Sequence, residues 1–130
     1  MAKRRHYIRV SIPVQDRERA KAFYIDQLGM QTIIEHEFAT VLVSHQTQIS
    51  LVESDDAGNA GYSLVTWLVN DIDRRMAKLR KAGVEFMSFD FGAIRTVDGK
   101  AEIDGDYVAW FKDSEGNLLA IAQVLEPADA

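Results

Sequence analysis

The strongest constraint on the fold is a weak internal repeat. Val14-Gln15-Asp16 is followed by Gly29, 13 residues after the aspartate. Val69-Asn70-Asp71 is followed by Gly83 after 12 residues, and the two aspartates lie 55 residues apart. A copy of roughly 60 residues would be only marginally stable alone, so we expect two copies that share one core.

The first copy predicts one strand, one helix and three further strands. Ile8, Val10 and Ile12 alternate with polar neighbours, which is the two-residue period of a strand. Asp16 as N-cap and Gly29 as stop predict a helix over about 17–28. Three β-prone runs follow, separated by turns short enough for antiparallel hairpins; they lie at about 30–35, 38–44 and 47–53.

The second copy begins after a polar, glycine-containing linker at 54–61. Asp71 is the predicted cap of a second helix that ends at Gly83. Further β-type runs occupy 62–69, 84–87, 106–111 and 117–124. The acidic stretch 88–106 is predicted to form a long loop or lid, and a functional lid and an ordinary exposed excursion are equally compatible with it.

Composition limits the class of protein. A chain of 130 residues with 47% hydrophobic residues suits a single domain over 1–130, and no apolar run approaches the ~20 residues of a membrane span. The absence of cysteine excludes disulfides, thiolate metal sites and cysteine nucleophiles. No apolar segment follows the basic start as in a secretion signal, so we expect a cytoplasmic protein.

The charge is uneven. Residues 1–24 carry a local charge of +5 in a chain of net charge −5, which leaves −10 for the remainder. An acidic body repels phosphate backbones, and the basic start is too short to form a nucleic-acid surface alone. We therefore expect neither a nucleic-acid nor a membrane partner.

Four segments carry a family resemblance. They are Ile-Pro-Val-Gln-Asp-Arg-Glu-Arg-Ala-Lys-Ala-Phe-Tyr (12–24), Gln-Leu-Gly-Met (27–30), Val-Asn-Asp-Ile-Asp (69–73) and Phe-Lys-Asp-Ser-Glu-Gly-Asn (111–117). In this order and spacing the chain resembles the vicinal oxygen chelate (VOC) superfamily of glyoxalase I, bleomycin-resistance proteins and extradiol dioxygenases. The resemblance implies an α+β fold of two βαβββ modules, about 7–53 and 62–124. Their curved mixed sheet would form a cup, with helices on its convex side, and a homodimer would be the common assembly.

The resemblance also implies four metal-ligand positions, which fall here on Arg9, Ser50, Leu64 and Ala120. None is a usual ligand, because a divalent cation prefers imidazole or carboxylate donors and a guanidinium stays protonated. The residues next to these four supply no strong ligand either. We therefore expect no metal and no cofactor.

Strand alternation around these positions predicts the side chains that line the cup. The predicted ligand-binding residues are Tyr7, Arg9, Ser11, Gln48, Ser50, Leu64, Thr66, Tyr107, Phe111 and Ala120. Tyr107 and Phe111 depend on a four-residue hairpin turn over 113–116, with Lys112 opposite Asn117. The same parity assigns Trp67 and Trp110 to the core. Arg9 is equally compatible with anion binding and with pairing to an acid of the 98–106 loop, and the tyrosines with ordinary wall positions.

Other chemistry has little support in the sequence. The three histidines, His6, His36 and His45, lie in the basic start or at predicted hairpin tips, and Glu35-His36-Glu37 cannot easily gather on one metal because His36 points away from its neighbours. No Ser-His-Asp grouping or phosphate-binding glycine loop is present. The lining predicts a small hydrophobic or aromatic ligand with a carboxylate or other acceptor.

Three functions remain open. The first is a metal-free small-molecule-binding protein that resembles the bleomycin-resistance branch. The second is an enzyme, either a glyoxalase-type lyase or dioxygenase with an atypical site, or an isomerase that uses a loop carboxylate; its catalytic residues are not assigned. The third is a regulatory module whose cup is vestigial.

Overall fold

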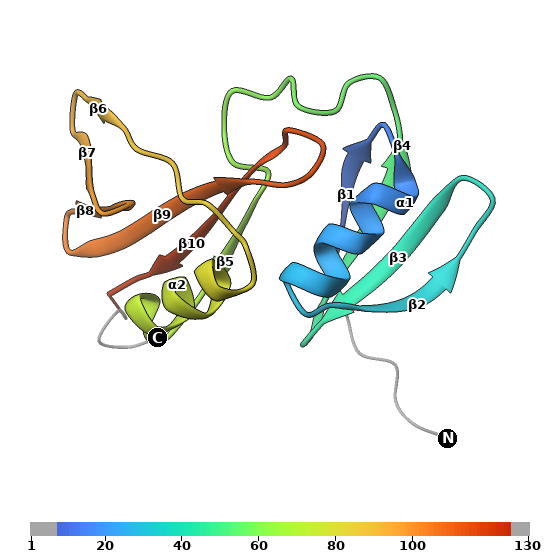
Figure 1. Cartoon of the computed structure of the whole chain (residues 1–130), viewed down its shortest axis with the longest axis horizontal. Helices are drawn as coiled ribbons and strands as arrows, with labels where there is room; N and C mark the ends of the chain where they lie inside the picture. Colours follow the sequence, from blue (N-terminus) through green and yellow to red (C-terminus); the bar gives the residue numbers. More distant parts are fainter. Residues whose placement is uncertain (1–7, 126–130) are drawn as a thin grey trace.

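The first half of the chain forms a four-stranded sheet with a helix on one face (Figure 1). The computed structural model describes residues 8–125. The elements are β1 (Ile8–Val14), α1 (Arg17–Ala22), η1 (Phe23–Gln27), β2 (Gln31–Glu35), β3 (Ala39–Ser44) and β4 (Thr47–Glu53). The strand order is β1-β4-β3-β2, with β1 and β4 parallel and the other pairs antiparallel.

The second half repeats this plan and extends it. Its elements are β5 (Val65–Leu68), α2 (Ile72–Lys81), β6 (Asp90–Phe91), β7 (Ile94–Val97), β8 (Lys100–Ile103), β9 (Asp106–Lys112) and β10 (Leu118–Gln123). The order is β5-β10-β9-β8-β7-β6, and the first and last strands, β5 and β10, again run parallel. The predicted α+β fold with paired βαβββ modules is confirmed.

Both helices begin where the sequence predicts. The Asp16 carboxylate accepts a hydrogen bond from the Arg19 N–H at 3.0 Å, and Asp71 accepts from the Arg74 N–H at 3.1 Å. The first helix continues from α1 as the π-helical turn η1, in which the Leu28 N–H donates to the Phe23 carbonyl. Gly29 then takes a φ of 76°, the left-handed conformation that ends helices.

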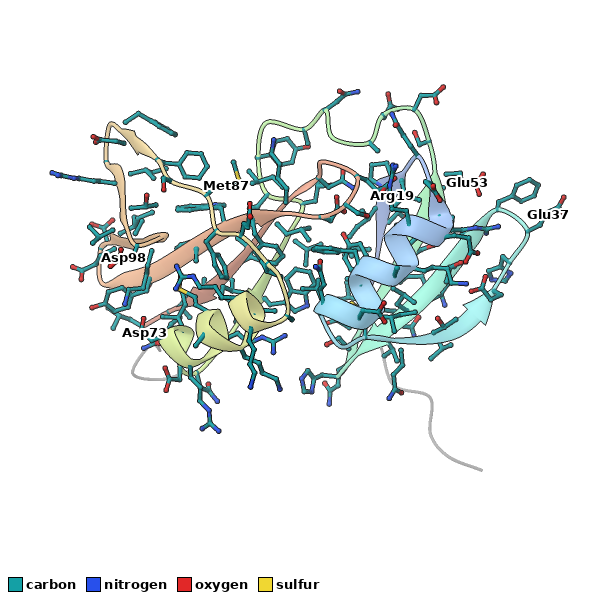
Figure 2. The ribbon with its side chains drawn as sticks, viewed as in Figure 1. Arg19, Glu37, Glu53, Asp73, Met87 and Asp98 are labelled. Atoms are coloured by element: carbon teal, nitrogen blue, oxygen red, sulfur yellow. The ribbon has the colours of Figure 1, made fainter. Side chains whose placement is uncertain are left out.

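The stretch 88–106 is not a loop, so the prediction of a long loop or lid is wrong. It forms β6, β7 and β8, which lengthen the second sheet by antiparallel pairing. The expected strand at 84–87, in contrast, reduces to one bridge between Phe86 and Phe111. Figure 2 places Met87 where this segment crosses β9, and its N–H donates to the Trp110 carbonyl.

One hydrophobic cluster joins the two halves. Alternate residues of the sheets point into it, including Ile12, Val14, Phe111 and Ile121, each at most 2% exposed. The helices contribute Ala20, Tyr24, Ile72, Met76 and Leu79. Burial of a large apolar side chain contributes about 1.5–3 kcal/mol, so this cluster fixes one face of each sheet and leaves the opposite face for other contacts.

The turn between β9 and β10 fastens the second half to the first. The Asn117 amide donates to the Pro13 carbonyl at 2.8 Å, and the Tyr24 hydroxyl donates to the Asp113 carboxylate at 2.6 Å. Both Glu115 carboxylate oxygens accept hydrogen bonds from the start of α1. Figure 2 shows Arg19 on this part of α1. The motif at 111–117 therefore has a structural role, because it orients the two sheets.

Within residues 8–125, the helices are all too short or too polar to cross a bilayer.

Candidate functional site

The predicted cup residues of the first half lie on the face of β1 and β4 away from the core. Arg9 is paired in register with Gln48, and Ser11 with Ser50. The Arg9 Nε donates to Gln48 Oε1 at 2.9 Å, and the Arg9 side chain is exposed. Among the described residues no acid lies within 4.0 Å of Arg9, so the alternative that an acid of 98–106 pairs with it is not observed there. The predicted ligand residue Tyr7 lies outside the described residues.

In the second half the hairpin register differs from the prediction. Lys112 is opposite Leu118, which leaves a five-residue turn over 113–117. A shift of one residue reverses the face of every side chain on the strand. Phe111 therefore lies on the core face opposite Leu119, where it is 0% exposed, and its ring stacks on Trp67 with centroids 6.4 Å apart.

The same shift moves two other aromatic residues. Tyr107 packs against the core and lies below the Lys100 ammonium, 4.8 Å from the ring centroid. The Glu102 carboxylate raises the pKa of Tyr107 above its ordinary value. Trp110, predicted in the core, lies instead on the opposite face, in register with Ala120.

The remaining predicted residues do not all lie on the same face of the second sheet. Thr66 is exposed and in register with Ala120, which is 1% exposed. Leu64 precedes β5 and packs partly buried against the core, as does Trp67, for which a core position was predicted. The structure thus brings Thr66, Ala120 and Trp110 into one row on the face of the second sheet that points away from the core. We call this the open face, and Tyr107 and Phe111 do not lie on it.

Two phenylalanines that the sequence analysis missed complete an aromatic surface. The Phe89 ring contacts Trp110 edge-on, with centroids 5.4 Å apart, and Phe91 contacts Phe89 at 5.7 Å. Phe91 is 60% exposed. The two-residue spacing of these phenylalanines is typical of a strand, but a loop was predicted for 88–106 and this spacing was not used. Phe89 and Trp110 are half-buried, and contiguous aromatic rings that reach solvent in part are typical of surfaces that bind apolar ligands.

The four positions implied for a metal do not fit one. Arg9 carries a fixed positive charge that donates to Gln48, Leu64 and Ala120 have no donor atom, and Ser50 alone offers a hydroxyl. Within residues 8–125 no three side chains of His, Cys, Asp or Glu gather as a metal-binding group. Divalent-metal chemistry therefore has no support from the donors at these positions.

The histidine-containing segment does not form a donor cluster in the described structure. Lys21 contacts the Glu35 carboxylate at 2.7 Å, and Thr40 donates to it at 2.9 Å. The Lys21 hydrogen bond lowers the pKa of Glu35, so this acid is a structural anion on the surface. His36 and His45 are exposed at the hairpin turns, and His6 lies outside the described residues.

Solved structures with this fold are named for different functions. TnmS3, an antibiotic binding protein from Streptomyces sp. CB03234, is 21% identical with a TM-score of 0.66; the match covers 96% of this chain and 100% of that one. A glyoxalase/bleomycin resistance protein/dioxygenase from Alicyclobacillus acidocaldarius is 17% identical with a TM-score of 0.71, covering 97% and 96%. A lactoylglutathione lyase from Agrobacterium tumefaciens is 12% identical with a TM-score of 0.68, covering 91% and 92%. At such identities the likeness shows the fold alone.

A comparison with curated proteins gives no significant match. The family profile of the Glyoxalase/Bleomycin resistance protein/Dioxygenase superfamily, in contrast, matches residues 6–121. This range begins before β1 and ends within β10, so it spans both βαβββ modules except for the last two residues of β10. The chain belongs to the Glyoxalase/Bleomycin resistance protein/Dioxygenase superfamily.

Proposed function

We propose that this protein binds a small hydrophobic or aromatic molecule without a metal ion, in the manner of the bleomycin-resistance branch of its superfamily. The observation that carries the proposal is the aromatic surface of Trp110, Phe89 and Phe91 on the open face of the second sheet. An antibiotic-binding protein among the solved structures with this fold supports the same class of ligand.

Arg9 supplies the polar part of the proposed recognition. Its guanidinium is exposed and its Gln48 partner is neutral, so N–H groups and a net positive charge remain for an acceptor on the ligand. A carboxylate is the acceptor that a guanidinium binds best. Because Arg9 and Trp110 lie on different sheets, their contributions are tested separately.

We further propose that the protein is a cytoplasmic homodimer with one binding domain per chain. Among the described strands, β1 and β5 each have a single hydrogen-bonded neighbour. They expose Ile8 at 71% and Leu68 at 68%. An edge strand with exposed apolar side chains favours pairing with another chain. Light scattering after size exclusion tests this state, and a monomer at all concentrations would contradict it.

The experiment for binding is a thermal-shift screen with aromatic acids, glutathione conjugates and glycopeptide drugs. A ligand at a hundredfold excess over its Kd stabilises the folded protein by about 2.7 kcal/mol, a readily measured increase in Tm. We expect Trp110→Leu to abolish the shift and Arg9→Gln to reduce it for carboxylate ligands. Arg74→Gln, an exposed substitution on α2, is the control and should leave the shift unchanged.

Two outcomes contradict the proposal. If no compound in the three classes shifts the Tm, the protein does not bind this kind of molecule. If a compound shifts wild type and Trp110→Leu equally, the ligand does not use the aromatic surface. A stoichiometric metal ion would instead support the enzyme alternative.

A further inference from the structure

A cavity lies between the two halves, mostly on their helix-covered side. Its volume is about 590 Å³, within the range of small-molecule sites. Its walls come from the end of η1 and Gly29, from the β3–β4 turn, from β5 and from α2. We propose that this cavity binds an amphipathic organic anion, a carboxylate or sulfonate attached to an aryl or alkyl group.

The inner wall of the cavity is apolar. Trp67, Leu79, Phe111 and Ile121 line it, and all four belong to or pack against the hydrophobic core. Leu79, Phe111 and Ile121 are at most 2% exposed and form a rigid backing, so the half-buried Trp67 and Val69 and the 68% exposed Leu68 supply the apolar surface that a ligand can reach. An aryl or alkyl group placed against this wall would remove its apolar surface from water without disturbing the core. This burial is the main source of affinity for such a ligand.

The rim of the cavity is cationic although the chain has a net charge of −5. Arg75 and Lys78 line it from α2, three residues apart and so on one face of the helix, whereas Asp26 is the lining carboxylate. Within the described residues neither Arg75 nor Lys78 has an acid within 4.0 Å. Two cations against one carboxylate favour an anionic ligand.

Arg75 is the stronger candidate for contact with the anion. Lys78 lies in the last turn of α2, where the free carbonyl ends carry partial negative charge. Arg75 lies one turn earlier and is half-buried, and a guanidinium can bind a carboxylate or sulfonate with two hydrogen bonds. Asn70 and Gln27 add neutral amides to the lining.

The two halves approach each other closely beside the cavity. Gly83 follows α2 with a φ of 101°, and the Gln27 Nε2 atom lies 3.0 Å from the position that a Cβ of residue 83 would occupy. Gln27 ends the π-helical turn η1, and such turns are frequent at functional sites. The first half therefore lies close to the second beside Gln27, which is one of the lining residues.

This site is separate from the proposed open-face site. Trp67 is in register with Ile121, on the core face of β5 and β10, whereas Trp110 is in register with Ala120 on the other face. The two inferences therefore depend on different side chains and can fail independently.

The test uses the full chain and the fluorescent probe 8-anilinonaphthalene-1-sulfonate, with sodium decanoate as a non-fluorescent competitor. We expect saturable probe binding that decanoate displaces. Arg75→Gln should weaken probe binding about fivefold, the effect of losing one partly exposed ion pair. The neighbouring control Arg74→Gln should leave it within about twofold.

A second pair of variants tests whether the probe binds in the cavity. Ala82, just after α2, lines the cavity, whereas Ala77 on α2 does not, and both are exposed. Ala82→Phe should block the probe and Ala77→Phe should not, with thermal unfolding showing that both variants fold. Equal effects within either pair, or no binding by the wild type, would overturn the proposal. Loss of probe binding in Trp110→Leu but not in Ala82→Phe would also overturn it, because the probe would then occupy the open face.

Discussion

Arg19 and Glu115, 96 residues apart in the chain, form a two-point ion pair that joins the halves of the molecule. The Arg19 Nε lies 2.7 Å from Glu115 Oε2, and the Nη2 lies 3.0 Å from Oε1. The Glu115 side chain is fully buried, while that of Arg19 is 52% exposed. The N–H groups of Gln15 and Asp16 donate to the same carboxylate, so one side chain fixes the start of α1 against the β9–β10 turn.

Glu115→Gln should lower the free energy of unfolding by about 2–4 kcal/mol. The amide loses the charge that Arg19 pairs with, and its NH₂ replaces one acceptor oxygen, so it faces either the Arg19 Nε–H or the N–H groups of Gln15 and Asp16. Urea denaturation measures the loss. Glu18→Gln is the matched control on α1, because Glu18 is 81% exposed and its pair with Lys21 should contribute at most about 0.5 kcal/mol. Equal stability of Glu115→Gln and wild type would contradict the role of the pair.

The stability of the protein should depend on this carboxylate at acid pH. The Arg19 hydrogen bond lowers the pKa of Glu115 from 4.5 to about 2, with help from the N–H of Asp16, the Ser114 hydroxyl and the N–H of Gln15, while burial opposes the shift. Since the folded pKa lies below the unfolded one, the stabilisation is present above pH 4.5 and is lost as the pH falls towards 2.

The difference in unfolding free energy between wild type and Glu115→Gln should therefore shrink between about pH 5 and pH 2. Urea titrations of both proteins across this range measure it. Glu18→Gln should show no comparable convergence with wild type. A difference that stays constant down to pH 2 would show that the Glu115 pKa is not depressed by folding.

Much of this fold follows from local sequence signals. Asp16 and Asp71 predict the caps that both helices have, and the turns at His36 and His45 predict the hairpins of the first sheet. These signals are local, so neighbouring residues suffice to determine them. The paired modules follow from the repeat for the same reason.

The face on which each predicted cup residue lies was predicted less well, because it depends on strand register. The turn after Lys112 has five residues, and this one additional residue places Trp110 on the open face and Phe111 in the core. No local signal distinguishes the two faces when both carry aromatic side chains. The acids of 88–106 indicated exposure, but antiparallel pairing gives the stretch its structure, and pairing depends on distant residues.

Tyr24→Phe should lower the free energy of unfolding by about 1–3 kcal/mol. The Tyr24 hydroxyl donates to the buried Asp113 carboxylate, and its loss removes a donor from that buried charge. Burial, together with Asp113, raises the pKa of Tyr24 well above its ordinary value, so the hydroxyl remains a donor at neutral and alkaline pH. Chemical denaturation checks this, with Tyr62→Phe, whose parent side chain is 68% exposed, as a control without effect. Equal stability of the two variants would refute the prediction.

Two glycines with similar backbone angles should tolerate alanine differently. Gly92 and Gly99 have φ values of 57° and 82°, so alanine adds about 1–2 kcal/mol of backbone strain at either. A Cβ at Gly99 would also lie 2.8 Å from the Phe86 Cβ, whereas one at Gly92 meets nothing within 4 Å. Thermal unfolding should therefore show a larger loss for Gly99→Ala, and the opposite order would contradict the packing of Phe86.

We propose that this superfamily member binds small molecules without a metal, and the residues at the four implied positions lack suitable metal donors. Elemental analysis of the purified, untagged protein by inductively coupled plasma mass spectrometry tests this most directly. The account predicts only substoichiometric nickel, zinc, iron and manganese, unchanged by prior incubation with these ions and removal of the excess. One tightly retained metal ion per chain would contradict it.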